Sequence, residues 1–309
     1  GIVVPQALCR QGVVVGALIW TIGLATRPML QLAADLRTMR IPVSMLDENG
    51  RYRPQDMPRG HCRLFSMANS ETPGVMAGRY LLALGHRRLL YLSPVHGPQW
   101  SRNRLAGIRR AVRGLGDAAR IEAVTADKYF PQEHFGFRQA AASMRKRAPT
   151  RSSAEEMLVA VVERDADRLE RVGRQLVLNR RMAGMLREAL GRPKVTAWLA
   201  ATDAVGLSAV EFLRTRGVRV PEEISVLTFD DGLDAYLHKV TSYNFNAAAV
   251  MHMMLSHVLN YPRERSVGSA DVVEVEGFVS ARSTTAPPGD AQRASISELD
   301  RPAPTGTGR

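Results

Sequence analysis

The sequence is poor in cysteine and in aromatic residues. Only two of its 309 residues are cysteines, Cys9 and Cys62, and aromatic side chains make up 6% of the chain. Two cysteines cannot build a disulfide framework or a cysteine-rich metal site. We therefore expect no metal centre, and a reducing compartment such as the cytoplasm suits the chain.

Long hydrophobic runs and export signals are also scarce. The apolar stretch at 12–22 is shorter than the roughly 20 residues that a helix needs to cross a bilayer. No basic segment followed by a small-residue cleavage site precedes this stretch. The sequence predicts neither a membrane span nor export.

Motifs typical of enzymes are missing. The chain has no serine nucleophile in a glycine elbow, no phosphate-binding glycine loop and no histidine pair at metal-binding spacing on a helix. His252 and His257, with the run MHMM, occupy helical positions where packing is the simpler explanation. We expect neither catalysis nor a cofactor.

Acidic residues are few where positive charge is concentrated. The formal net charge is +12, residues 79–113 include eight arginines and no acid, and residues 138–194 include fourteen bases and seven acids. Such charge can attract polyanions. The mixture in the second region is more typical of solvated helix faces, so that interpretation is favoured while a polyanion site stays open.

Short aliphatic runs alternate with amphipathic stretches along the chain. This alternation predicts an α/β fold with parallel sheets flanked by helices. The expected strands are 13–20, 41–46, 89–92, 121–125, 195–200, 224–229 and 272–278. The expected helices are 29–39, 73–84, 102–115, 134–144, 204–216 and 247–259.

Two regions depart from this rhythm. Residues 147–193 contain a capping box, Ser153 with Glu156, and apolar residues at helical spacing, which predicts one long helix or a helical pair inserted into the fold. Residues 286–309 are dominated by Pro, Gly, Ser, Thr and charge, and we expect them to form a disordered tail.

Several segments carry a family resemblance. They are "AGRYLLALGHRRLLYLSP" at 77–94, "SRNRLAGIRRAVRGLG" at 101–116, "WLAATDAVGLSAVEFLRTRGVRVPEEISVLTFDD" at 198–231 and "VSARSTT" at 279–285. In order and spacing they resemble the effector-binding part of the lactose-repressor and galactose-repressor (LacI/GalR) family of bacterial transcriptional regulators. In that family, the segment "GHRRLLYL" is scaffold that closes a helix and begins a strand.

The resemblance implies a periplasmic-binding-protein-like fold of two α/β lobes joined by three crossings, expected near Ser93, Thr241 and Val275. The N-terminal lobe would comprise 1–93 plus 242–273. The C-terminal lobe would comprise 94–241 plus 274–285, including the helical insert at about 147–193, with the tail at 286–309 outside both.

The family motifs also imply ligand-binding residues. Arg104 stands where the family places an arginine that binds effector hydroxyls or a carboxylate. Asp230 follows a buried-looking strand where the family has a sugar-binding acid, and Asp231 is the better candidate for capping the turn. Asp203 matches a family position but could equally cap the next helix, and Thr202 stands where the family commonly has asparagine.

Further candidates depend more on position than on motif. Trp100 lies beside the arginine motif and could stack on an apolar ligand face, or pack in the core. Trp20, at the end of an early strand, has the same two interpretations. Asn69 and Ser70 stand where the family often has Asp-Asn, which makes Asn69 a candidate ligand residue.

The function implied by the resemblance is the ligand-sensing and dimerisation core of a cytoplasmic transcriptional regulator. A small polar metabolite such as a sugar would bind between the lobes of a homodimer and modulate operator binding by an N-terminal headpiece. The alternative is a solute-binding protein of a transport or chemoreceptor system with the same fold. An interaction module built on the basic insert is a third, weaker hypothesis.

The chain departs from the family at its beginning. Nothing before Val15 matches a DNA-binding headpiece or a hinge helix. The first helix and second strand of the N-terminal lobe also lack counterparts, so we expect that lobe to be truncated. "HKVTSYNF" replaces the family's usual proline-containing linker, which predicts a different hinge.

Overall fold

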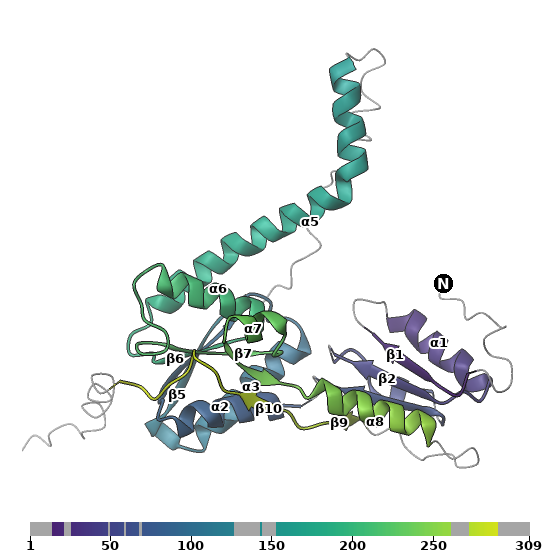
Figure 1. The fold of residues 1–309 in the computed structure, drawn as a ribbon, viewed down its shortest axis with the longest axis horizontal. Coiled ribbons are helices and arrows are strands. Elements are labelled where there is room, and N and C mark those ends of the chain that lie inside the picture. Colours follow the sequence, from purple (N-terminus) through teal and green to yellow (C-terminus); the bar gives the residue numbers. More distant parts are fainter. Residues whose placement is uncertain are drawn as a thin grey trace, which may run out of the picture.

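The computed structural model contains two sheets, each covered by helices on both faces (Figure 1). It describes residues 14–21, 26–48, 50–58, 60–67, 70–126, 143, 153–260 and 272–289. The smaller sheet has the order β1-β2-β3-β9, formed by Ala17–Trp20, Val43–Asp47, Cys62–Ser66 and Val273–Glu274. All of its strand pairs are parallel.

Helices α1 (Thr26–Thr38) and α8 (Ala247–Leu259) cover the smaller sheet. Successive side chains of a strand point to opposite faces. Val43 and Met45 accordingly join the core that contains α1 residues, while Leu46 joins the core with α8. The neighbouring Ser44 hydroxyl donates to the Met254 carbonyl at 2.8 Å, which ties α8 to β2.

The larger sheet has six strands in the order β10-β8-β7-β6-β4-β5. The β10–β8 pair is antiparallel and the other pairs are parallel. Strands covered on both faces are apolar throughout. The strands are β4 Arg88–Ser93, β5 Arg120–Thr125, β6 Ala197–Ala200, β7 Ser225–Phe229, β8 Thr241–Asn244 and β10 Phe278–Ser280.

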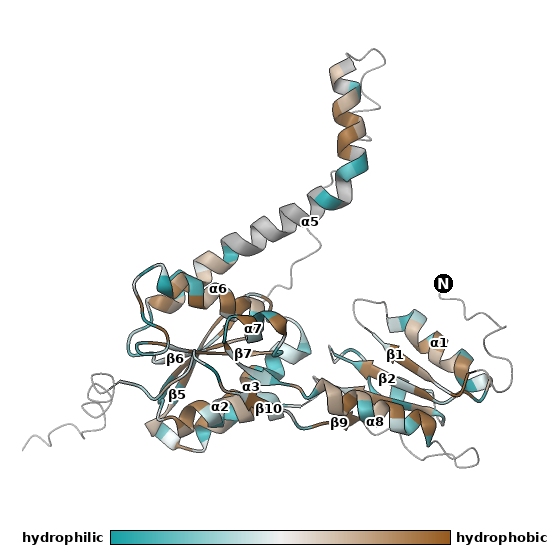
Figure 2. Cartoon of the chain, viewed as in Figure 1, coloured by the Kyte–Doolittle hydropathy of each residue, from teal (hydrophilic) through white to brown (hydrophobic). Residues whose placement is uncertain are grey.

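Among the described residues, four helices cover the two faces of this sheet (Figures 1 and 2). One core contains residues of α2 and α3, and the other contains residues of α6 and the end of α5. These helices are α2 Thr72–Ala83, α3 Gln99–Arg113, α5 Ser153–Leu190 and α6 Asp203–Arg214. Shorter helical segments are α7 Leu233–Leu237, η2 Pro54–Asp56 and η3 Gly116–Ala118.

A glycine pair brings α2 and α3 into close contact. A Cβ atom added to Gly74 would lie 2.0 Å from the carbonyl oxygen of Arg104, and one added to Gly107 would lie 2.1 Å from that of Glu71. Only hydrogen side chains permit this crossing. The glycines therefore set the position of the α3 backbone from which the Arg104 side chain extends.

The predicted fold class is confirmed. Helix α8 has the predicted bounds, and the insert forms one long helix, α5, which projects from the body and changes direction along its length (Figure 1). Strand β3 was not predicted, and the strand expected at 272–278 is two short strands separated at 275–277. The helix expected at 134–144 lies outside the described residues.

Strand pairing places the first crossing earlier than predicted and the second crossing later. Strand β4 pairs with both β5 and β6, so residues 88–93 belong to the larger sheet and the first crossing precedes α2 rather than following Ser93. Strand β8 also pairs in the larger sheet, so the second crossing follows Asn244 rather than Thr241. The physical reason is that β4 is a central strand. Its apolar residues become buried when β5 and β6 pair on either side of it.

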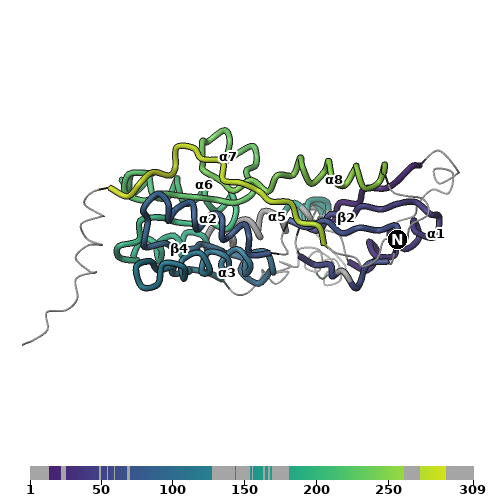
Figure 3. Tube along the Cα trace, turned by 90° about the horizontal axis from the view of Figure 1, so that it is seen from below, coloured from purple at the N-terminus to yellow at the C-terminus, as the bar shows by residue number. Residues whose placement is uncertain are grey.

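The last described segment, 272–289, runs from the smaller sheet onto the larger one (Figure 3). The predicted tail begins too early, because Ala286 is held by hydrogen bonds. Its carbonyl accepts from His86 Nε2 at 2.9 Å, and its amide donates to Ser225 Oγ at 3.1 Å. Residues 290–309 lie outside the described part.

His86 explains the scaffold role of the "GHRRLLYL" segment. Gly85 has a φ of 102°, which ends α2 and turns the chain toward β4. The His86 side chain is buried, and its Nδ1 lies 2.8 Å from the Thr196 hydroxyl. Burial lowers the pKa of His86 to about 4, so the neutral ring joins three chain segments at neutral pH.

Among the described residues, the model contains no helix with the length and apolar character needed to cross a membrane.

Candidate functional site

Arg104 is a buried cation at the inner side of α3. It is 8% exposed, and its Nη1 donates to the carbonyl oxygen of Ala201, just beyond the end of β6. Its Nη2 lies 3.2 Å from Oδ1 of Asp230, just beyond the end of β7. A guanidinium with several donors in a plane can make these contacts and still direct others toward a bound molecule.

Three aromatic rings surround this guanidinium. The Cζ atom of Arg104 lies 4.7 Å from the ring centroid of Trp100 and 4.9 Å from those of Phe229 and Phe245. Cations over aromatic faces are stabilised electrostatically. The arginine is therefore held by aromatic faces as well as by a carboxylate, in a fixed orientation.

Asp230 has an unusual backbone and a perturbed acidity. Its φ is 111°, a value that residues with a Cβ rarely adopt. Its side chain keeps 45% of its surface accessible, yet the surrounding protein raises its pKa to about 6. Loss of water is the largest cause, Arg104 opposes it, and repulsion from Asp203 adds to it. Strained backbone and a shifted pKa are typical of functional sites.

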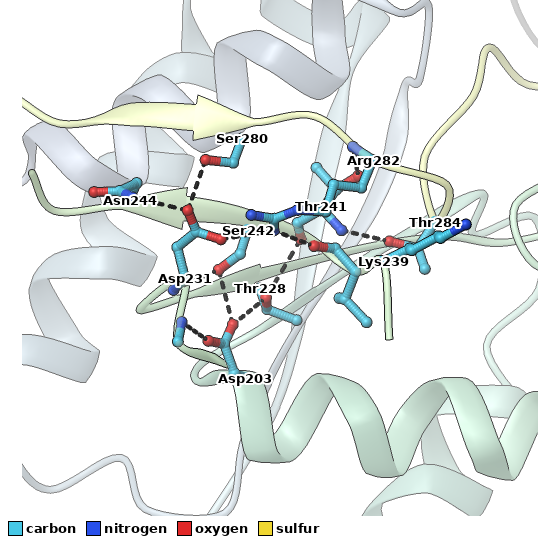
Figure 4. Close-up of polar contacts among 12 residues, drawn as sticks. Asp203, Thr228, Asp231, Lys239, Thr241, Ser242, Asn244, Ser280, Arg282 and Thr284 are labelled. Atoms are coloured by element: carbon cyan, nitrogen blue, oxygen red, sulfur yellow. Dashed lines mark hydrogen bonds and ion pairs between the residues drawn. The ribbon is translucent and has the colours of Figure 1, made fainter. Parts of the chain in front are cut away.

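Asp203 anchors the turn that carries Asp230 (Figure 4). Its carboxylate accepts hydrogen bonds from the Thr228 hydroxyl, from the Ser242 hydroxyl at 2.8 Å and from the Gly232 amide at 2.7 Å. Thr202 is the N-cap of α6, with its hydroxyl accepting from the Val205 amide at 3.4 Å. Asp203 therefore positions the turn, and Thr202 caps the start of α6.

Asp231 is the centre of a second polar network (Figure 4). Its Oδ2 accepts from Asn244 at 2.8 Å and from Ser280 at 2.7 Å, and its Oδ1 lies 2.6 Å from Nη1 of Arg282. Burial favours a raised pKa, but the hydrogen bonds from Arg282, Ser280 and Asn244 lower the pKa of Asp231 below its ordinary value. The network ties β8 to β10.

The remaining candidates divide between the two lobes. Trp100 lies on the guanidinium of Arg104, whereas Trp20 ends β1 in the other sheet and is 46% exposed. Burial raises the pKa of Glu48 beside Trp20. Asn69 lies outside the described residues, and the adjacent Ser70 donates to Glu274 at 2.6 Å, linking the start of α2 to β9.

Sequence reasoning missed the two phenylalanines beside Arg104. Phe229 immediately precedes the candidate acid in "LTFDD", so its position was a usable signal. Phe245 gave no local signal, because it reaches the site only through the pairing of β8 with β7. It also lies at the second crossing, where the chain leaves the larger sheet for α8.

These features define a class of protein. Three chain passages, before α2, after β8 and between β9 and β10, join two α/β lobes. Asp230 and the guanidinium of Arg104 lie just beyond the ends of β7 and β6, at the carboxyl-end edge where α/β sheets bind ligands. The architecture is that of a two-lobed periplasmic-binding-protein-like domain.

Comparisons with known proteins agree with this architecture. Residues 134–285 match the family model described as periplasmic binding protein-like domain. A LacI transcriptional regulator from a Rhodococcus species has a TM-score of 0.53 and 18% identity, covering 91% of this chain and 81% of that one. No curated protein matches the sequence.

Two further solved structures are similar. A transcription regulator from Lactobacillus plantarum has a TM-score of 0.53 and 17% identity, covering 89% of this chain and 82% of that one. A LacI family transcriptional regulator from Enterococcus faecium with bound ribose has a TM-score of 0.52 and 17% identity, covering 92% and 83%. The predicted resemblance to the effector-binding domain of LacI-type regulators is confirmed, and the chain has that fold.

Proposed function

We propose that this chain is the ligand-sensing and dimerisation core of a cytoplasmic transcriptional regulator. In this proposal a small polar metabolite, with a sugar as the leading class, binds between the lobes and modulates DNA binding by a headpiece. The observation that carries the proposal is the pair formed by buried Arg104 and accessible Asp230, 3.2 Å apart beside three aromatic rings.

The chemistry of this pair suits a polyhydroxylated molecule. Arg104 donates, and the accessible carboxylate of Asp230 accepts from hydroxyls. Trp100 supplies a partly buried aromatic face on which the C–H face of a sugar ring can lie. The ribose named in the Enterococcus faecium structure belongs to that protein and supports sugars as the first compounds to test.

The site also has a physical link to the crossings. Phe245, at the second crossing, contacts the guanidinium of Arg104, and the Asp231 network ties together the strands β8 and β10 that flank two crossings. A ligand that binds Arg104 and also contacts the smaller lobe would favour one arrangement of the lobes. Such differential affinity is the means by which an effector changes an attached DNA-binding unit.

Dimerisation is proposed through the smaller lobe. Val15 and Leu18, beside and within the edge strand β1, and Leu259, at the end of α8, are 62%, 41% and 60% exposed. Exposed apolar residues on one lobe suit a subunit contact. Leu18→Asp should then weaken a homodimer in sedimentation analysis, and an unchanged mass would contradict this contact.

Thermal shift and calorimetry with a panel of pentoses, hexoses and polyols test the ligand site. We expect at least one compound to raise the melting temperature of the wild type. Arg104→Gln and Asp230→Asn should abolish this increase, whereas Arg109→Gln, on an exposed position of the same helix, should retain it.

Two results would count against the proposal. Ligand binding that survives unchanged in both site variants would place the site elsewhere. A panel without any binder would reject sugars and polyols as the ligand class. Asp230→Asn is the decisive variant if Arg104→Gln does not fold, because Asn keeps the shape of the side chain.

A further inference from the structure

The part of α5 that precedes its buried end, residues 153–181, divides into an acidic half and a basic half. Residues 153–170 contain six acids and two arginines, a net charge of −4. Residues 171–181 contain four arginines and no acid, a net charge of +4. Charge segregated in this way along one helix gives it an electrostatic direction that a partner can recognise.

Most of this helix projects away from the body (Figure 1). Its last turns are anchored, because Met182, Leu186 and Ala189 are buried in the core of the larger lobe. Near its start, Met157 and Leu158 are 70% and 52% exposed. The next residue, Val159, is buried. A projecting helix with exposed apolar residues gains stability when a partner covers them.

Apolar residues follow a coiled-coil spacing along the projecting part. Steps of four and three residues alternate through positions 158, 162, 165, 169, 172 and 176, which are Leu, Val, Asp, Leu, Val and Leu. This spacing keeps one seam facing a second helix. The single acid in the seam is the kind of polar residue that restricts register.

We propose that α5 is a self-association arm that pairs antiparallel with α5 of a second copy of this chain. Antiparallel pairing sets residues 153–163, with three acids and no base, against residues 171–181 of the other arm, with four arginines and no acid. Parallel pairing would set like charges against each other along the whole length. In the antiparallel register centred near residue 167, position 158 lies opposite 176 of the second copy, and 162 lies opposite 172.

A second copy is the occupant that complements both halves. The preceding segment 138–151 contains five bases and no acid, so its charge matches the acidic half of the arm and repels the basic half. A nucleic acid would match the basic half and be repelled by the acidic one. The arm contact is separate from the proposed contact through the smaller lobe, and it would join such dimers in pairs.

Charge reversal on the full chain tests the pairing. The first variant carries Glu155→Arg, Glu163→Arg and Asp165→Arg, and the second carries Arg171→Glu, Arg174→Glu and Arg180→Glu. Each alone should halve the wild-type mass in sedimentation, whether that mass corresponds to two or to four chains. An equimolar mixture should restore the mass, because one arm is then basic and the other acidic.

A matched control reverses three exposed charges away from the arm, Arg109→Glu, Arg110→Glu and Arg113→Glu on α3. It should leave the mass unchanged, and circular dichroism should report native helix content in all variants. An unchanged mass in both arm variants, or no recovery on mixing, overturns the proposal. A wild-type chain that stays monomeric at high micromolar concentration also overturns the proposal.

Cysteine cross-linking tests the orientation. In a Cys9→Ser, Cys62→Ser background, Leu158→Cys and Leu176→Cys chains should cross-link when mixed and not when separate. Cross-linking of Leu158→Cys chains with each other would show parallel arms and overturn the antiparallel assignment. Loss of association on reversing the bases of 138–151, with the arm intact, would make that segment the occupant instead.

Discussion

Two arginine–aspartate pairs lie side by side after β7 and have opposite properties. Arg104 and Asp230 are 3.2 Å apart, with side chains 10% and 45% exposed, and the aspartate has a raised pKa. Arg282 and Asp231 are 2.6 Å apart, 18% and 5% exposed, and the aspartate has a lowered pKa. The same chemical pair is therefore used in two ways by adjacent residues.

Hydrogen-bond supply accounts for the difference. Asp231 accepts hydrogen bonds from Asn244 and Ser280 on Oδ2, and its Oδ1 is ion-paired with Arg282, and these contacts offset the water that its burial removes. Asp230 has lost water, accepts hydrogen bonds from the Arg104 side chain and the Asp203 backbone, and is repelled by the charge of Asp203. A carboxylate that can accept further hydrogen bonds is suited to binding a ligand, whereas one that the protein supplies with partners has a structural role.

The largest expected effect comes from breaking the pair formed by Arg282 and Asp231. Arg282→Met should lower the free energy of unfolding by about 3–5 kcal/mol, because it leaves the buried Asp231 charge without its cation. Urea denaturation at pH 7 measures this change. Asp231→Asn combined with Arg282→Met should recover part of the loss, and a single variant as stable as the wild type would remove the proposed difference between the pairs.

His86 also makes the free energy of unfolding depend on pH in the acid range. Its contribution must be removed before the two aspartates are compared. The pKa of His86 is lowered to about 4, so the unfolded chain takes up a proton below about pH 6.5 that the folded chain refuses. Stability should therefore fall between pH 6.5 and 4, by up to about 3 kcal/mol. Urea titrations should show this fall in the wild type and a flatter curve in His86→Gln.

The two aspartates should respond to amide substitution with opposite signs. The folded chain keeps a proton on Asp230 up to about pH 6, whereas the unfolded chain releases it near its ordinary pKa, so ionisation at pH 7 costs stability. Asp230→Asn should stabilise the fold at pH 7, by about 1 kcal/mol after allowing for solvent screening, and have a much smaller effect at pH 4.

Asp231→Asn should destabilise the fold at pH 7, because a lowered pKa contributes stability above the ordinary pKa that is lost as pH falls. Thermal melts of both variants in the His86→Gln background give the comparison. Shifts of the same sign at pH 7 would contradict the assignment of one ligand-binding and one structural acid.

The smallest expected effect concerns the three aromatic rings around Arg104. Phe245→Leu keeps an apolar side chain but removes one ring from Arg104, a loss of about 0.5–1 kcal/mol that should weaken ligand binding a few-fold. Calorimetry measures it with the compound found in the panel. Phe212→Leu is the matched control, because Phe212 lies under Arg216 at 3.7 Å on α6; equal weakening in both would deny Phe245 a role.

Much of the fold could be predicted because its signals are local. Helix α8 has the predicted bounds, and β4 is a continuous aliphatic run between a glycine turn and a helix. Strand β3 escaped prediction because its apolar part, Leu64–Phe65, is too short to distinguish from a loop. The motif around Arg104 and Asp230 identified the two residues that the structure brings together.

By itself, the sequence determined the alternation of most strands and helices, the glycines that allow α2 and α3 to cross, and the opposite charges along α5, because periodicity, backbone freedom and charge are properties of neighbouring residues. The tertiary structure alone decided where the lobes divide, which ring reaches Arg104 from β8, and why Asp230 and Asp231 differ in pKa. Strand partners, burial and donors come from residues distant in the chain, and no local pattern encodes them.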